Sequence, residues 1–522
     1  MQPPEMGGGG IVVSATNRFP LLTRLALPDA AMIVSIVVLF FGLFMGDGAG
    51  KLFRDSDTGW HIRNGESILA GNALPRTDPY SFTKAGERWF AWEWGADVIM
   101  GAAHQWDGLR GVAVLFSVTV ALCVWTWFQL HWAVNGNFFL ACLMSAPALT
   151  ALNLHWLARP HVFSWILCLA ALLILERGGG RFTWRQGAGL VVMGAVWANV
   201  HASFLFLPGA AMVYAAGHWL RRALWDEPGF PAWFLAAAGC GAAGTLFNPY
   251  GTGLHSHVFT YLANTELLSR VAEFQSFNFH VEGAGQITAA IVLVMGGGIL
   301  AIVNRKPEHA LLCIGLAALS LRSARAIPIA ALCGLPLANA ALTSALSQWR
   351  VRKEVREALD GFLAYSWRLR VLESRAGGYA IGAFAVMAAI ALMRTPVMAE
   401  KAGFPPDQFP VAAAEAVAAL PTGARLLAPD KFGGYLIYRF NGERKVFFDG
   451  RSDFYGAGMM KRYIDLIEAR PGWRNQVEQY GFTHALLPNR YSLVDGLEAW
   501  GWKRMYRDET ATLLARDSRV RK

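Results

Sequence analysis

Apolar segments long enough to cross a lipid bilayer recur along the chain, and this feature limits the possible fold more than any other. A spanning helix needs about 20 mostly apolar residues, because lipid offers no hydrogen-bond partner to an open backbone. The sequence predicts about 11 such segments, two of them short, and it places their boundaries to within a few residues. They lie near residues 30–46, 108–130, 137–154, 160–176, 187–199, 203–219, 231–247, 286–303, 308–320, 326–346 and 377–394.

The composition agrees with a membrane protein. Of the 522 residues, 54% are hydrophobic and only 16% are charged, whereas soluble domains carry roughly a quarter of charged residues. All six cysteines fall inside apolar segments without metal-ligand spacing, which argues against a disulfide framework or a zinc site. The net charge of +10 is compatible with nucleic-acid binding, so the position of the basic residues decides its meaning.

Lysine and arginine gather in alternate loops. With a cytoplasmic N-terminus, four of the five inside loops are basic, as the positive-inside rule requires, and only the first lacks Lys and Arg. The charge excess is thus a signal of topology, and no nucleic-acid partner is needed to explain it. The last inside loop, Arg350–Arg375, is typical of an amphipathic helix on the membrane surface. The five loops are His131–Gly136, Arg177–Gln186, Arg221–Pro228, Asn304–Pro307 and Arg350–Arg375.

The same count divides the chain into three parts. Residues 1–28 form a cytoplasmic segment, in which Gly7–Gly10 is expected to be disordered. Residues 29–399 form the transmembrane domain with a long first external loop at 47–107, and residues 400–522 form an extracytoplasmic domain. The first apolar segment ends in Gly-Asp-Gly without a small-residue cleavage site, so we expect it to stay as an anchor in the cell (inner) membrane.

The first external loop carries two carboxylates just beyond a span. Asp55 and Asp57 are separated by one residue, a spacing that suits either holding a divalent cation or deprotonating an acceptor hydroxyl. An equally good interpretation is that one of them caps the following helix, expected at Gly59–Leu69. A second interfacial helix is expected at Ala91–Gln105, and the tryptophans near it favour an aromatic belt over a sugar platform.

Other polar residues lie at external helix ends. Guanidinium groups match phosphate geometry, so Arg159, Arg322 and Arg325, with His161, are candidates for a phosphate clamp. Each arginine can instead extend its side chain to the membrane interface beside it. For the histidines at 255, 257 and 280 a solvated loop position is favoured, since their spacing is too loose for a metal site. The external candidates are Arg159, His161, Asn199, His201, Arg322 and Arg325.

After Pro405 the composition becomes that of a soluble α/β domain. Strands alternate with helices, and two Gly-rich pieces, Phe432–Tyr435 and Phe448–Asp453, fall where strands end, the usual place for ligand contacts. Asp449-Gly450 is equally typical of an ordinary turn, and no nucleotide fingerprint is present. The expected strands are Arg425–Ala428, Lys445–Asp449, His484–Leu487 and Ala511–Ala515. The expected helices are Lys431–Arg439 (a helix or a turn leading into it), Met459–Tyr480 (one helix or two) and Ser492–Trp500.

This arrangement resembles the GT-C superfamily of membrane glycosyltransferases. The likeness lies in the number of spans, the acidic first external loop and the external C-terminal domain, and it covers most of the chain. Phe432–Ile437 looks loosely like the Trp-Asp-Tyr-Gly region of oligosaccharyltransferases, but the Trp and the Asp are absent. Asp57–Arg63, Arg159–Trp165, Trp197–Phe204 and Phe448–Tyr455 look like segments of uncharacterised bacterial membrane proteins assigned to this superfamily.

The resemblance implies a fold, a reaction and a set of site residues. The fold would be a polytopic α-helical membrane protein with a small extracytoplasmic α/β domain. Such an enzyme moves a sugar from a polyprenyl-phosphate-linked donor to a lipid, glycan or protein acceptor, with inversion. Asp57 or Asp55 would be catalytic, a divalent cation (Mg or Mn) is the one cofactor implied, and metal ligands are not identified. The substrate-binding residues would be His61, Arg159, His161, Asn199, His201, Arg322, Arg325, Asp449 and Arg451.

Two other functions fit the same pattern. A lipid-linked glycan ligase or polymerase also has external Arg and His residues, but usually carries its main external loop late in the chain. A transporter or flippase for a lipid-linked or anionic substrate would place charges near the bilayer midplane and show paired halves. In this chain the charges lie at one boundary and no repeat is visible.

Overall fold

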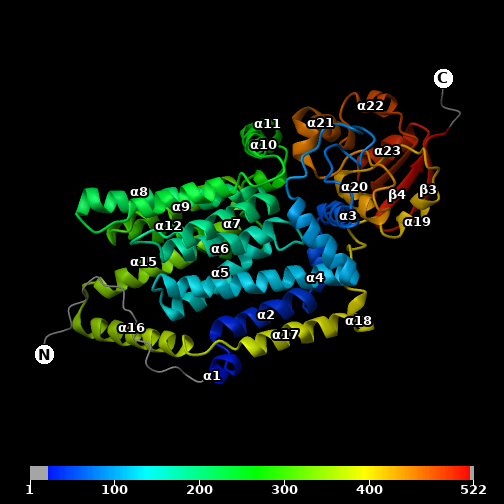
Figure 1. The fold of residues 1–522 in the computed structure, drawn as a ribbon. Coiled ribbons are helices and arrows are strands. Elements are labelled where there is room, and N and C mark those ends of the chain that lie inside the picture. Colours follow the sequence, from blue (N-terminus) through cyan, green and yellow to red (C-terminus); the bar gives the residue numbers. More distant parts are fainter. Residues whose placement is uncertain (1–20, 518–522) are drawn as a thin grey trace.

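The chain folds into a long block of helices with a small α/β domain at one end (Figure 1). The structure, a computed structural model, describes residues 21–517, so Gly7–Gly10 and most of the segment 1–28 lie outside the described part. In Figure 1 the long helices run side by side, and the strands β3 (Lys503–Arg507) and β4 (Ala511–Ala515) lie at the end opposite α16 (Lys353–Glu373).

Each of the predicted apolar segments coincides with a helix. Within the described residues, five helical stretches are long and apolar enough to cross a membrane, at residues 24–44, 94–133, 202–225, 284–303 and 324–348. The chain is therefore a polytopic helical membrane protein, as the apolar pattern predicts. The main helices are α2 (Ala30–Phe44), α4 (Trp94–Ala133), α5 (Phe138–Asn153), α6 (His161–Glu176), α7 (Trp184–Val200), α8 (Phe206–Trp225), α9 (Pro231–Gly244), α12 (Ala284–Val303), α13 (Pro307–Arg322), α15 (Leu335–Gln348) and α17 (Tyr379–Met393).

Short helices gather at the end of the block that carries the α/β domain. The predicted first-loop helix is α3 (Asp57–Leu69), preceded by the 3₁₀ helix η1 (Gly48–Phe53). The second predicted interfacial helix is the start of α4, which bends at Asp107 and Gly108 before its apolar part. Other short elements are η2 (Ala202–Leu205), α10 (Thr252–Ala263), α11 (Thr265–Leu268), η3 (Ala272–Phe274), η4 (Ala324–Ala326) and α18 (Pro396–Ala399). The remaining short elements are α1 (Leu21–Ala26), α14 (Ile327–Ile329) and the π-helix η5 (Ala330–Gly334).

The C-terminal domain contains a four-stranded sheet in the order β1-β2-β4-β3. β1 (Leu426–Leu427) pairs parallel to β2 (His484–Pro488), whereas β4 pairs antiparallel to both β2 and β3. The sequence analysis missed β3, and its expected strand at Lys445–Asp449 is wrong, because this segment stays outside the sheet. The helices of the domain are α19 (Ala413–Ala418), α20 (Asp430–Arg439), α21 (Ser452–Ile467), α22 (Trp473–Tyr480) and α23 (Ser492–Ala499).

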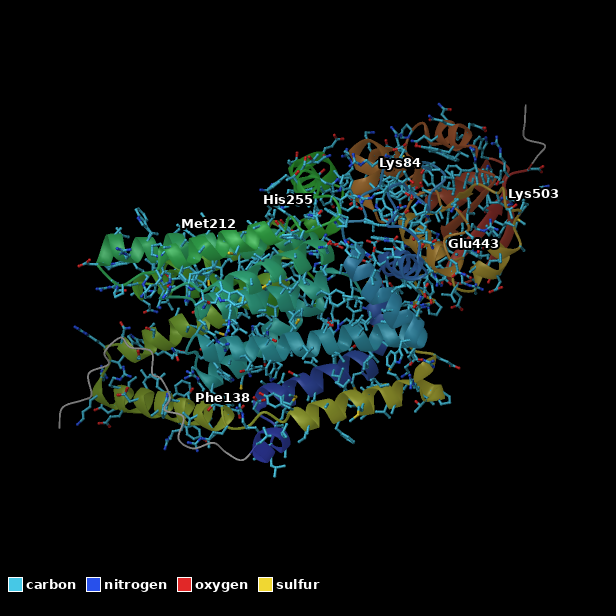
Figure 2. The ribbon with its side chains drawn as sticks, in the orientation of Figure 1. Lys84, Phe138, Met212, His255, Glu443 and Lys503 are labelled. Carbon is cyan, nitrogen blue, oxygen red and sulfur yellow. The ribbon has the colours of Figure 1, made fainter. Side chains whose placement is uncertain are left out.

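The loop at residues 47–107 is packed into the C-terminal domain. Val446 forms an isolated parallel bridge with Ser81, donating its backbone N–H to Tyr80 and accepting one from Phe82. Lys84, labelled beside the domain in Figure 2, donates from Nζ to the carbonyl of Phe454 at 3.2 Å. The loop and the domain therefore form one unit rather than a loop under a separate cap.

Glycines allow α3 and α20 to approach closely. A Cβ atom on Gly59 would lie 2.5 Å from the carbonyl oxygen of Gly434, and one on Gly434 would lie 2.6 Å from the carbonyl oxygen of Ser56. Arg63 fixes the contact by donating from Nε to the carbonyl of Tyr438 at 2.9 Å. The N-terminal turn of α3, where Asp57 lies, is thus pressed against the C-terminal domain.

Candidate active site

Arg159 lies at the centre of a half-buried group of charges where the helical block meets the C-terminal domain. It comes from the short turn between α5 and α6, and its guanidinium contacts three carboxylates. Nη1 lies 3.0 Å from Asp55 Oδ2 and 2.6 Å from Glu273 Oε1, and Nη2 lies 2.8 Å from Asp57 Oδ2. The predicted acidic pair and one of the predicted arginines therefore meet in space, although more than 100 residues separate them in sequence.

Asp55 makes the capping contact that was one of the two interpretations left open by the sequence. Its Oδ1 accepts the backbone N–H of Asp57 at 2.9 Å, which satisfies a free donor at the start of α3, while its Oδ2 pairs with Arg159. Asp57 is the first residue of α3, where the helix dipole favours a negative charge. Asp55 thus caps the start of α3, and the side chain of Asp57 is available for contacts within the candidate site.

Asp57 is enclosed on the side of the C-terminal domain by Gly450. A Cβ atom on Gly450 would lie 1.9 Å from Asp57 Oδ1, so only glycine fits at this position. Burial raises the pKa of the Asp57 carboxyl to about 8, and the opposing effect of the Arg159 charge is smaller. A carboxyl that gains and loses its proton near neutral pH suits general base chemistry.

A second layer of polar residues lies behind this pair. His61, fully buried on α3, is 2.6 Å from Asp97 Oδ1 through Nδ1, and Asn64 donates to Asp97 Oδ2 at 2.5 Å. His61 Nε2 has no hydrogen-bond partner among residues 21–517 and lies 3.8 Å from Oε2 of Glu93. Burial, followed by the charge of Arg159, lowers the pKa of the His61 imidazole well below its ordinary value.

Glu93 is a buried carboxyl between two imidazoles. Besides its approach to His61, its Oε1 lies 3.6 Å from Nε2 of His201. Burial raises the pKa of Glu93 to about 8, although nearby Arg159 opposes the effect. His201 Nε2 is also 3.3 Å from Nη2 of Arg325, whose Nη1 lies 3.0 Å from Oε2 of Glu273.

Glu93 and Glu273 are site residues that the sequence analysis did not select. Glu93 had a usable signal, because it is a single acid within the aromatic stretch Phe90–Trp94 beside a span. Glu273 follows a run of loop residues, and nothing in its local sequence separates it from solvent-exposed acids such as Glu266.

Asp449 and Arg451 form a buried ion pair next to the site. Arg451 donates from Nε and Nη2 to the two carboxylate oxygens of Asp449, both at 2.7 Å, and Nη2 also lies 2.9 Å from Asp78 Oδ1. Tyr455 donates its hydroxyl to Asp449 at 2.9 Å. These contacts fix the Asp449–Arg451 turn, and with it Gly450, against Asp57. The Asp449–Arg451 pair thus holds Gly450 in place beside Asp57. Its contact with substrate stays a prediction.

The other predicted residues are placed differently. His161 Nε2 donates to the carbonyl of His155 at 2.8 Å, and its ring lies 6.4 Å from that of His201, at the edge of the group. Asn199 accepts from Trp94 Nε1 at 2.7 Å and donates to the carbonyl of Phe247 at 2.8 Å, so its polar atoms are used by the fold. Arg322 is exposed at the end of α13, outside the group.

The carboxylates do not form a metal site in this arrangement. Within residues 21–517 no three His, Cys, Asp or Glu side chains are arranged to hold a metal ion. Arg159 contacts both Asp55 and Asp57, and a cation bound by the pair would have to displace this guanidinium. The divalent cation therefore stays an expectation from the resemblance, and no chemical step is assigned to it.

Comparisons with known proteins give distant structural matches only. No family model and no curated protein matches the sequence. The apo structure of the Archaeoglobus fulgidus oligosaccharyltransferase is 13% identical, with a TM-score of 0.48 over 88% of this chain and 69% of that one. ArnT from Cupriavidus metallidurans bound to undecaprenyl phosphate is 13% identical, with a TM-score of 0.48 over 94% and 98% of the two chains. Apo ArnT gives 12% identity and a TM-score of 0.40 over the same fractions. At this level of similarity no residue role is taken from these proteins.

Proposed function

We propose that this membrane protein is a glycosyltransferase that moves a sugar from a polyprenyl-phosphate-linked donor to an acceptor, with inversion at the anomeric carbon. The observation that carries the proposal is the pairing of Asp57 with Arg159 at 2.8 Å, at the end of a membrane-embedded bundle. A proton acceptor and a guanidinium group side by side supply the two functions that transfer from a phosphate requires. The expected superfamily, GT-C, is the one that the sequence resembles.

Asp57 is the proposed general base. In its ionised form the carboxylate removes the proton from an acceptor hydroxyl or amine, and the freed electron pair attacks the anomeric carbon. Its raised pKa near 8 makes it a stronger base than an ordinary aspartate while leaving part of the population ionised at neutral pH. Asp55 is the proposed positioning residue, because it binds the backbone N–H of Asp57 and the guanidinium of Arg159.

The proposed role of the two arginines is to stabilise the leaving phosphate. As the new bond forms, the bond between the anomeric carbon and the phosphate oxygen breaks, and its electron pair leaves with the phosphate. Guanidinium groups at Arg159 and Arg325 would stabilise this charge, which in a buried site is a large electrostatic effect. Attack opposite the leaving phosphate inverts the anomeric centre.

We place the site on the extracytoplasmic face of the cell membrane. The support is the charge of the loops, since the basic loops alternate with those that carry the site residues. A lipid-linked donor enters from the outer leaflet, and the C-terminal domain contributes the Gly450 side of the site. The acceptor is then a lipid, a glycan or a protein outside the cytoplasm.

Single-residue variants test the assignment. Full-length protein in proteoliposomes is given polyprenyl-phosphate-linked sugars, and transfer is followed by mass spectrometry of the products. Asp57→Asn is expected to lose about 100-fold or more of the rate, because the amide accepts no proton, whereas Asp55→Asn is expected to lose less. If both variants keep full activity, the assignment fails. Transfer of whole lipid-linked chains rather than single sugars would favour the ligase.

A further inference from the structure

One carboxylate, that of Glu273, bridges the two arginines of the site. Its Oε1 lies 2.6 Å from Nη1 of Arg159, and its Oε2 lies 3.0 Å from Nη1 of Arg325. The two arginines come from distant segments, one before α6 and one in η4. Two guanidinium groups that converge on one pair of oxygens form the geometry of an anion clamp. In this structure a side chain of the protein fills the clamp.

The surroundings favour an anion strongly at this position. Although burial raises the pKa of the Glu273 carboxyl, the charges of Arg159 and Arg325 outweigh it and hold that pKa well below its ordinary value. The same guanidinium groups would stabilise any singly charged oxyanion of similar size. The position is therefore selective for charge rather than for a glutamate as such.

The backbone around Glu273 is fixed, whereas its side chain is long. Ser323 donates its hydroxyl to the carbonyl of Glu273 at 3.0 Å, and Ala324 donates its N–H to the carbonyl of Gln275 at 2.9 Å. Ser276 donates to the carbonyl of Leu321 at 2.8 Å. These bonds hold η3 and its flanks against the end of α13. The carboxylate can leave the clamp by rotation about its own side-chain bonds, without movement of the loop.

We propose that Glu273 is an internal stand-in for the substrate phosphate, which it blocks from the clamp until a phosphate displaces it. The inference rests on the proposed function for the identity of the natural ligand. A sugar-phosphate diester carries one negative charge, so its exchange for one carboxylate leaves the charge held between the two arginines unchanged. This exchange avoids adding a further anion beside Asp55 and Asp57, which both already face Arg159.

Direct binding of small anions tests the clamp without any transfer reaction. Full-length protein in detergent is titrated with inorganic phosphate, dimethyl phosphate and acetate in a calorimeter. Glu273→Gln keeps the size of the side chain and removes the competing charge, so we expect it to bind phosphate and dimethyl phosphate about 10-fold tighter or more than wild type. Glu266→Gln is the matched control, because Glu266 lies on the same connection, is 62% exposed and pairs with Arg270 rather than with the site.

A double variant locates the binding site. In Glu273→Gln, the further change Arg325→Gln is expected to abolish the gain, because one half of the clamp is removed. Melting temperatures of all variants verify folding, and Glu273→Asp, whose shorter side chain cannot reach both arginines, gives an intermediate affinity if Gln is unstable. Equal affinities in Glu273→Gln and Glu266→Gln, or a gain that survives Arg325→Gln, would overturn the inference. A stronger gain with acetate than with phosphate would contradict a phosphate clamp.

The transfer assay separates this inference from the proposed function. If Glu273→Gln gains phosphate affinity but wild type transfers no sugar from any lipid-linked donor, the clamp stands and the glycosyltransferase proposal falls. If wild type transfers sugar and the Glu273→Gln variant shows no gain in affinity, the proposed function stands and the stand-in role falls.

Discussion

Gly450 lies so close to Asp57 that a single added carbon atom would come within 1.9 Å of the Asp57 Oδ1 oxygen. The two residues belong to different parts of the molecule, the C-terminal domain and the loop at residues 47–107. The turn that carries Gly450 is fixed by the ion pair of Asp449 and Arg451 on either side of it. The C-terminal domain is thus one wall of the candidate active site, and it covers one side of the carboxyl.

Gly450→Ala is expected to impair the site without unfolding the protein. The methyl group must displace the Asp57 carboxylate from its present position beside Arg159, and a misplacement of about 1 Å can cost about 100-fold in rate. Gly458→Ala is the matched control, because that glycine lies on the nearby helix α21 with open space around it. Sugar transfer and melting temperature are measured for both variants. Equal rates in the two variants would contradict the contact.

The pH dependence of transfer is expected to reflect the ionisation of Asp57. The carboxyl must be ionised to act as a base, and its pKa is raised to about 8, so the rate should increase with pH and level off above about 8. Well below that value the ionised fraction, and hence the rate, changes about tenfold per pH unit. Rate profiles between pH 5.5 and 9.5, set roughly around this pKa, measure the effect.

Glu93 offers an internal control, since burial raises its pKa to about 8 as well. If Asp57 is the titrating base, Glu93→Gln keeps the rise of the rate with pH, even where the maximal rate is lower. A rate that becomes independent of pH in Glu93→Gln would assign the titration to Glu93 instead.

Arg451 is expected to be needed for stability. Its guanidinium is buried together with Asp449 and Asp78, and Arg451→Met would leave two buried carboxylates without a cation. Breaking a buried pair from one side costs about 3–5 kcal/mol, which should appear as a large drop in melting temperature. Arg470→Met, which removes an exposed arginine paired with Asp465 on the same domain, should change the melting temperature little.

The contacts of Arg159 predict that chelators leave transfer unchanged, which is opposite to the divalent cation that the resemblance implies. Arg159 already contacts Asp55 and Asp57, so the pair as arranged has no place for a divalent cation. The rate in excess EDTA should stay within about twofold of the rate with added Mg²⁺ or Mn²⁺, a difference of less than about 0.5 kcal/mol in the barrier. A rate that vanishes in EDTA and returns with one of these ions would show that Arg159 moves aside for a metal.

The helices could be predicted from the sequence because lipid imposes a local rule. Each apolar segment must satisfy its own backbone, so length and composition suffice to locate it. The expected strand at Lys445–Asp449 had no such rule. Its aromatic residues Phe447 and Phe448 are buried by ring contacts, such as the stacking of Phe448 on Tyr463 at 4.1 Å, and not by strand pairing. The sequence of such a short apolar segment does not show whether ring contacts or strand pairing will bury it.

The candidate site was only partly predictable for a related reason. The charge of the loops, counted over the whole chain, is enough to predict that Asp55, Arg159 and Arg325 lie on the same side of the membrane. The role of Glu273 required the contacts themselves, because an acid in a long loop becomes part of the site only when two distant arginines converge on it. Gly450 likewise resembled an ordinary turn residue until the position of Asp57 was known.

Native mass spectrometry of the purified protein tests the central claim most directly. The protein is released from mild detergent, and the masses of retained lipids are compared between wild type and Arg325→Gln. The account predicts an isoprenoid phosphate, with or without a sugar, bound to wild type and depleted in the variant. Ordinary phospholipids alone, or an isoprenoid phosphate retained equally by both proteins, would contradict a phosphate-linked donor at this site.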